Sequence, residues 1–180
     1  MTIRSCAIAA GCALLLALST PLLAQEPAPI AQDHVRPLTS AARALVNAGG
    51  ARSAAIRQLL DRLDVSDLIV YVDVQWFHET RSGRLAFVGS AAGNRYVVLQ
   101  IACGQIGSDQ IVALGHELRH AVEVADAGEV IDRQTFSRLY QRIGQEVGGI
   151  GQNRQFETRA AIDVGRRVKD DLSSPSNSGR

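Results

Sequence analysis

Two histidines and a glutamate stand close together in the stretch LGHELRHA, as His116, Glu117 and His120. Residues four apart on a helix lie one turn apart on the same face, so the two imidazoles can bind one zinc ion. Glu117 lies about a third of a turn from His116, where its carboxylate can reach a zinc-bound water without being a ligand. The spacing therefore predicts zinc ligands at His116 and His120 and a catalytic base at Glu117.

A catalytic zinc ion also needs a third protein ligand and an open position for water. Glu123 shares the histidine face, but about 10 Å of helix rise separates it from His116, so it is better placed to support a ligand than to be one. Asp126 stands at the third-ligand spacing of the metzincin motif. However, Glu123 replaces the glycine of that motif, and Met1 is the only methionine, so the chain has no methionine turn.

The acid that we expect to be the third ligand is Glu157, at the start of a final helix predicted for residues 156–168. Its helical face continues through four apolar residues, namely Ala160, Ala161, Val164 and Val168. The carboxylate therefore stands in line with residues that should be buried. A buried carboxylate without a partner is costly, and a zinc ion supplies one. The alternative interpretation is an acid in the first helical turn that the helix dipole stabilises.

The elements that must position these residues follow from the apolar periodicity. Two short helices are expected within residues 39–64, with Gly49 and Gly50 as the break between them. Strands are expected at 68–74, 84–88 and 95–102, with a turn at 91–94. Further helices are expected at 108–125, capped by Ser108 and Asp109, at 132–143 and at 156–168, with a glycine-rich loop at 144–151. The pattern predicts a single α+β domain in which a small antiparallel sheet packs on helices.

The first 24 residues have the features of a secretory signal peptide. Arg4 precedes a short apolar run, Pro21 interrupts that run, and Ala24 offers a small residue for cleavage. The protein is therefore expected to be exported, either periplasmic or secreted, with no transmembrane segment after cleavage. We expect an extended leader at 25–37, a folded domain at 38–172 and a disordered tail at 173–180.

The composition excludes some classes of function. Of 180 residues, 46% are hydrophobic, and 19 lysines and arginines nearly balance 18 aspartates and glutamates. The chain thus has no basic excess that would favour a nucleic-acid partner. After loss of residues 1–24, Cys103 is the only cysteine, so no intrachain disulfide can form, and we expect it to be a small buried residue. Stability must then come from the core or from a metal ion.

The chain resembles the zincin metallopeptidases, and specifically the gluzincins, in which a glutamate on a later helix is the third zinc ligand. The resemblance consists of His116, Glu117 and His120 on one helix, a small sheet before that helix, and Glu157 after it. It covers residues 65–170 in architecture, and the chain is also similar to small exported bacterial HExxH proteins of unassigned activity. One departure is Ala161, because many gluzincins carry an aspartate at that position.

The resemblance implies a zinc-dependent hydrolase, most simply a metallopeptidase, whose substrate is a peptide or protein in the cell envelope or outside the cell. Glu117 would take a proton from zinc-bound water and deliver it to the leaving amine. An extended peptide would pair with an exposed sheet edge. The sequence does not identify the oxyanion donor, and by chemistry alone the candidates are Tyr96, Arg119, Tyr140 and His78.

Two alternatives of another class stay open. Zinc could serve only to hold the last helix onto the sheet, in which case Glu117 would be dispensable. The domain could also have a zincin-like fold without activity and bind a partner in the cell envelope.

Overall fold

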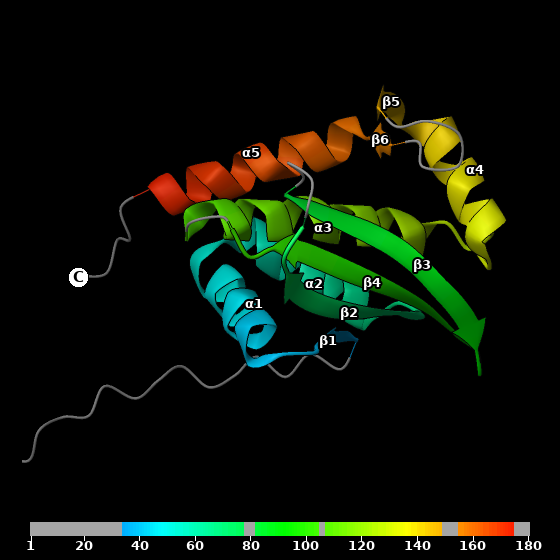
Figure 1. Ribbon diagram of the computed structural model, residues 1–180, viewed down its shortest axis with the longest axis horizontal. Coiled ribbons are helices and arrows are strands. Elements are labelled where there is room, and N and C mark those ends of the chain that lie inside the picture. Colours follow the sequence, from blue (N-terminus) through cyan, green and yellow to red (C-terminus); the bar gives the residue numbers. More distant parts are fainter. Residues whose placement is uncertain (1–33, 78–81, 105–106, 149–154, 175–180) are drawn as a thin grey trace, which may run out of the picture.

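A four-stranded sheet with the strand order β1-β2-β4-β3 forms the base of the fold (Figure 1). The computed structural model describes residues 34–77, 82–104, 107–148 and 155–174. Strands β1 (Val35–Pro37), β2 (Leu68–Gln75) and β4 (Asn94–Ala102) are mutually parallel, whereas β3 (Gly83–Ala91) is antiparallel to β4. The α+β class is confirmed, but the expected antiparallel sheet is wrong, because the sheet is mixed and mostly parallel.

The parallel direction of β2 and β4 follows from the order of the strands in the sheet. The turn at 91–94 does form a tight hairpin between β3 and β4, with φ of 51° at Ala92 and 80° at Gly93. However, β3 does not pair with β2. The hairpin places β3 at the outer edge and inserts β4 beside β2, where Val70 pairs with Val97 in parallel register. Strand order beyond neighbouring segments cannot be read from apolar alternation.

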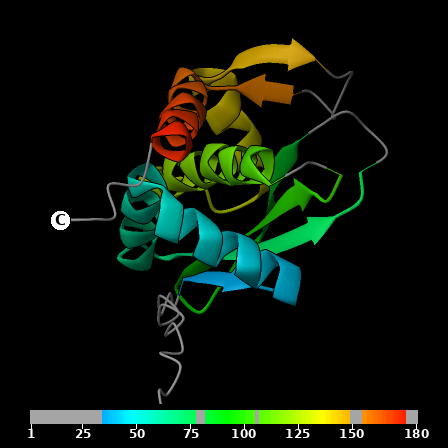
Figure 2. The same ribbon diagram turned by 90° about the vertical axis from the view of Figure 1, so that its left-hand side faces the viewer.

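Five helices are described. They are α1 (Ser40–Arg52), α2 (Ala54–Asp64), α3 (Ser108–Asp126), α4 (Arg133–Ile143) and α5 (Arg159–Ser173). Helices α1, α2 and α3 cover one face of the sheet, and α5 lies along α3 and also contacts α2 (Figures 1 and 2). The segment predicted as a glycine-rich loop contains strand β5 (Gln145–Gly148), which forms an antiparallel hairpin with β6 (Gln155–Glu157).

The two N-terminal helices are confirmed, but the break between them falls at Ser53 and not at the glycines. Ser53 caps α2 by accepting from the backbone N–H of Ile56, and its hydroxyl donates to Asp171 of α5. Gly49 lies inside α1, where an added Cβ would stand 3.0 Å from Ile56 and 3.1 Å from Leu114. This glycine therefore allows helices to approach closely and does not end one.

Part of the predicted leader belongs to the sheet. Val35 is 1% exposed and pairs with Val70, so the sheet begins before residue 38. Residues 1–33, which include the predicted signal peptide, lie outside the described residues, as do residues 175–180. Within the described part of the chain, no helix is long and apolar enough to cross a membrane.

Cys103 is exposed, so the expectation of a buried cysteine is wrong. It follows Ala102, the last residue of β4, and thus lies beyond the end of the strand core.

Helix α3 is the centre of the molecule. Its apolar residues at helical spacing, Ile111, Leu114, Leu118, Ala121 and Val122, are buried. The helix begins at Ser108, with Gly107 as its N-cap and no side-chain cap bond, so the predicted capping by Ser108 and Asp109 is wrong. Burial of its packing faces, more than capping, therefore holds this helix in place.

Arg95 ties the end of α3 to the sheet. This arginine is 5% exposed at the start of β4, and its guanidinium donates to the backbone carbonyls of Val124 and Ala127 at 2.8 and 2.7 Å. The same guanidinium donates to the carboxylate of Asp67, which holds the pKa of that carboxyl below its ordinary value. Arg95 thus satisfies carbonyls that the helix end leaves without intrahelical partners.

We expect Arg95→Met to lower the free energy of unfolding by about 3 kcal/mol, because buried carbonyls would lose their donors. Urea unfolding at neutral pH measures this loss. Arg43→Met, on the exposed surface of α1, is the control and should change the free energy of unfolding by about 0.5 kcal/mol or less. Equal losses in the two variants would contradict the role assigned to Arg95.

Candidate metal centre

Three potential metal ligands converge from two segments that are far apart in the sequence. His116 and His120 lie one turn apart on α3, and Glu157 ends strand β6. Oε2 of Glu157 lies 2.9 Å from Nε2 of His116 and 3.8 Å from Nε2 of His120. One donor atom from each residue can be chosen so that all three lie within 4.8 Å of one another. The structure thus brings together the three residues predicted to be ligands.

Glu157 reaches this place from a strand and not from a helix. It is the last residue of β6 and pairs with Gln145 of β5, while Thr158 is the N-cap of α5. The prediction that Glu157 begins the final helix is therefore wrong, and so is the alternative of an acid in the first helical turn. The apolar periodicity after Glu157 belongs to α5, and the threonine cap marks its true start.

The donor set fits a divalent cation. Oε2 of Glu157 is buried and makes no hydrogen bond of good geometry, although it stands 2.9 Å from an imidazole nitrogen. A buried carboxylate oxygen without such a bond is costly, and a metal ion would satisfy it. Two imidazoles and one carboxylate also form a recurrent ligand set of metal enzymes.

The charges around the site favour a positive charge at its centre. Burial works against ionisation of Glu157, but the close approach and charge of the His116 and His120 imidazoles outweigh it and lower the pKa of Glu157 to about 2. Burial likewise opposes protonation of His120, yet the carboxylates of Glu123, Glu157 and Glu117 raise its pKa to about 9. A cation bound among these groups would meet the same stabilising field.

Glu123 supports His120, as its position on the histidine face predicts. Its Oε2 lies 2.9 Å from Nδ1 of His120, and its Oε1 accepts a 2.6 Å hydrogen bond from the hydroxyl of Thr158. Nε of Arg119 stands 3.8 Å from the same Oε1. With Nδ1 engaged in this way, Nε2 of His120 is the nitrogen that faces Glu157.

Thr158 is a residue that the sequence analysis missed. Its hydroxyl accepts from the backbone N–H of Ala161, which caps α5, and also donates to Glu123. A threonine ahead of a helical pattern is a signal for the cap, but nothing local in the sequence shows its second partner. Ala161 of α5 is buried, and the carboxylate that contacts His120 is that of Glu123, three residues further along α3.

Glu117 lies beside the ligand group and is 7% exposed. It packs against the first residue of β3: a Cβ added to Gly83 would stand 2.7 Å from Cγ and 2.9 Å from Oε1 of Glu117. Its charge is among the causes that raise the pKa of His120, which places it within electrostatic reach of the site. Glu117 is therefore close to the ligand group without belonging to it.

The other residues considered from the sequence have separate roles. Asp126 forms an ion pair with Arg62 of α2 and is not part of the ligand group. The buried hydroxyl of Tyr140 donates to the backbone carbonyl of His120, so it supports the helix. Tyr96 stacks on Tyr71, and it alternates along β4 with the core residues, which places it on the opposite face of the sheet.

Two oxyanion candidates remain from the sequence analysis. Arg119 is directed toward Glu123, as described above. His78 lies outside the described residues.

No family model, curated protein or solved structure matches this chain. The resemblance to zincins therefore rests on the HExxH residues and their surroundings alone. What the structure establishes is an α+β domain with a possible His-His-Glu metal site.

We expect the purified protein to hold about one divalent metal ion per chain, by elemental analysis. His116→Ala and Glu157→Ala should each lose the ion, because two donors rarely retain a metal, whereas Glu117→Gln should keep it. Circular dichroism of each variant controls for folding. A folded wild-type chain that binds no divalent metal would contradict the site.

Glu123→Gln should weaken metal binding by about 10- to 100-fold, because the carboxylate that orients His120 and adds to its basicity is lost. Competition with a chelator of known affinity measures the change. Thr158→Val should weaken metal binding in the same direction but less, since Glu123 would lose only one partner. Glu129→Gln, at an exposed ion pair with Arg142, is the control. Unchanged affinity in Glu123→Gln would contradict this role.

Proposed function

We propose that the protein is a zinc-dependent hydrolase, and most simply a metallopeptidase. The observation that carries the proposal is a buried carboxylate, Glu117, adjacent in sequence to the first member of the His116, His120 and Glu157 group. Two imidazoles and a carboxylate alone also suit non-haem iron. An additional carboxylate beside the ligands is what a hydrolase needs as a base, and this favours zinc.

The position of each residue relative to the ligand group suggests its role in the proposed reaction. When bound, zinc would lower the pKa of a water molecule and polarise the scissile carbonyl. Glu117 accepts the proton of the attacking water and delivers it to the leaving amine. Its side chain lies against Gly83 of β3, where an added Cβ would stand 2.9 Å from Oε1. Glu123 and Thr158 keep the His120 ring oriented while this occurs.

The sheet edge supports a peptide substrate. Strand β3 is an outer strand of the sheet, and its first residue, Gly83, contacts Glu117. An extended peptide that adds to this edge through backbone hydrogen bonds would pass beside the catalytic base. Gly83 is buried, and the absence of a side chain there leaves room for Glu117 beside the strand.

A non-catalytic role is the alternative. The ligand group joins the β5–β6 hairpin to α3, so a bound ion would also stabilise the packing of the C-terminal segment. However, structural zinc sites are normally closed by four protein ligands, and the group recognised among the described residues has three. An open position favours catalysis over a purely structural or partner-binding role.

We also propose that the protein acts after export, in the periplasm or outside the cell, on peptides or proteins there. The support is the pattern of residues 1–24, with Arg4, an apolar run, Pro21 and Ala24. N-terminal sequencing of the chain isolated from the producing cells would locate the cleavage, expected near Gln25.

Glu117→Gln should lower kcat toward an internally quenched peptide library by about 100-fold or more while the zinc content stays unchanged, because the base is lost and the ligands are not. Asp109→Asn, in the exposed first turn of the same helix, is the control and should keep full activity. Equal activity in Glu117→Gln and wild type would contradict the mechanism. A zinc-loaded wild type that cleaves no member of the library would favour the non-catalytic alternative.

A further inference from the structure

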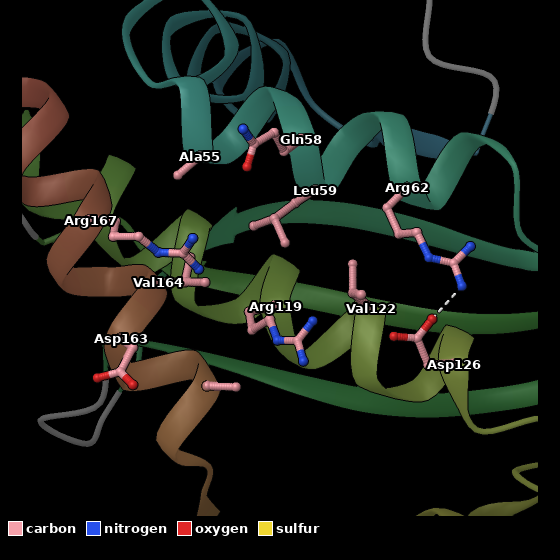
Figure 3. Close-up of a pocket in the computed structure, with 11 residues that line it drawn as sticks. Ala55, Gln58, Leu59, Arg62, Arg119, Val122, Asp126, Asp163, Val164 and Arg167 are labelled. Carbon is pink, nitrogen blue, oxygen red and sulfur yellow. Dashed lines mark hydrogen bonds and ion pairs between the residues drawn. The ribbon is translucent and has the colours of Figure 1, made fainter.

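A cleft of about 500 Å³ lies between α2, α3 and α5, away from the metal centre (Figure 3). Its floor is apolar and is formed by Leu59, Val122 and Val164, one from each helix. Arg62, Arg119 and Arg167 line it as well, again one from each helix. The volume falls within the range of small-molecule sites in proteins, and an apolar floor with a few polar groups is their usual construction.

The three arginines differ in how far nearby carboxylates already neutralise their charge. Arg62 is ion-paired with Asp126 across the cleft. Arg119 is 28% exposed, and its nearest carboxylate, Glu123 at 3.8 Å, is already engaged by His120 and Thr158. This leaves donor capacity on the guanidinium of Arg119.

Of the three arginines, Arg167 has the fewest interactions with acidic side chains. It is exposed, and its side chain has no hydrogen bond or ion pair with any residue in the described ranges. The carboxylate of Asp163, the other acid on the cleft, pairs instead with Arg159 and Arg166. In Figure 3 the guanidiniums of Arg119 and Arg167 both extend into the cleft, and the Asp163 carboxylate points away from it.

We propose that this cleft binds an organic carboxylate that has a short apolar body. The planar guanidiniums of Arg119 and Arg167 would hold the carboxylate through paired hydrogen bonds, for which arginine geometry is suited. The apolar body would lie against what Leu59, Val122 and Val164 still expose, which is 8%, 2% and 2% of their surfaces. A small inorganic anion would use the arginines but leave this floor uncovered.

The cleft shares no residue with the proposed ligand group, although its Arg119 stands 3.8 Å from Glu123, which contacts His120. The cleft residues Val164 and Arg167 lie on one face of α5, whereas Gly165 faces His116 and Gly115 contacts Val168 on another. None of the three potential metal ligands lines the cleft. Binding here can therefore succeed or fail whether or not the protein is a hydrolase.

Calorimetric titration of the full mature chain, loaded with its metal, tests the proposal with three probes at constant ionic strength. Octanoate carries both features, octanamide lacks the charge, and acetate lacks the apolar body. We expect octanoate to bind and each of the other two to bind about tenfold more weakly or not at all. Arg167→Gln should weaken octanoate binding by about tenfold, because one charged partner is lost.

Lys169→Gln is the matched control, since it removes one positive charge from α5 at a residue that does not line the cleft. It should leave octanoate affinity unchanged, and circular dichroism and metal content should show that both variants are intact. Octanamide binding as tight as octanoate would overturn the proposal, because the arginines would then have no role. Failure of octanoate to bind, or equal effects of Arg167→Gln and Lys169→Gln, would overturn it too.

Discussion

The hydrogen bond from Thr158 to Glu123 is the interaction on which the site depends most. It connects α3, which carries both histidines, to the segment that carries Glu157. The threonine hydroxyl also caps α5, so the same atom fixes where that helix starts. Glu157, the residue before this cap, is still in strand β6, and it faces the histidines from there. Thr158 thus fixes three features together: the start of α5, the support of His120 through Glu123, and the position of Glu157.

Close packing of α3 and α5 makes this connection possible. A Cβ at Gly115 would stand 2.6 Å from Val168, a distance that no real side-chain contact tolerates. Gly165 faces His116 from α5 with ordinary contact distances of 3.9–4.0 Å for an added Cβ. Gly115 therefore lets the helices approach until residues at their ends can form the site, at a modest cost in helix propensity, whereas a Cβ at Gly165 would fit without a shift.

The carboxylates near His120 are costly to bury, and a bound cation would offset that cost. Glu117 and Glu123 are each 7% exposed, and an apolar replacement of similar size would stabilise most cores. Glu123 is satisfied by two hydrogen bonds, but Oε2 of Glu157 makes no hydrogen bond of good geometry. Such an arrangement gains stability when a cation enters it. The same reasoning separates this site from the cleft beside α2, where the exposed Arg167 has no acidic partner among the described residues and a bound anion would supply one.

The sequence by itself determined the features that depend on near neighbours. The spacing of His116 and His120 fixes their common helical face, the apolar stripe of α3 follows from its period, and Glu123 shares the histidine face at three residues' distance. The sequence also pointed to Glu157, which the structure places beside the two histidines, although from a strand and not from the helical face that the apolar pattern indicated. These inferences require only helix geometry and the cost of burying charge.

Only the tertiary structure decided the features that depend on distant partners. Strand direction, the β5–β6 hairpin and the placement of Glu157 in a strand arise from pairing between segments, which apolar alternation cannot specify. The donation from Thr158 to Glu123 joins residues 35 positions apart, and the cleft is lined by residues of three different helices. Hydrogen bonds and packing between distant segments are set by the whole core, so no short window of sequence contains them.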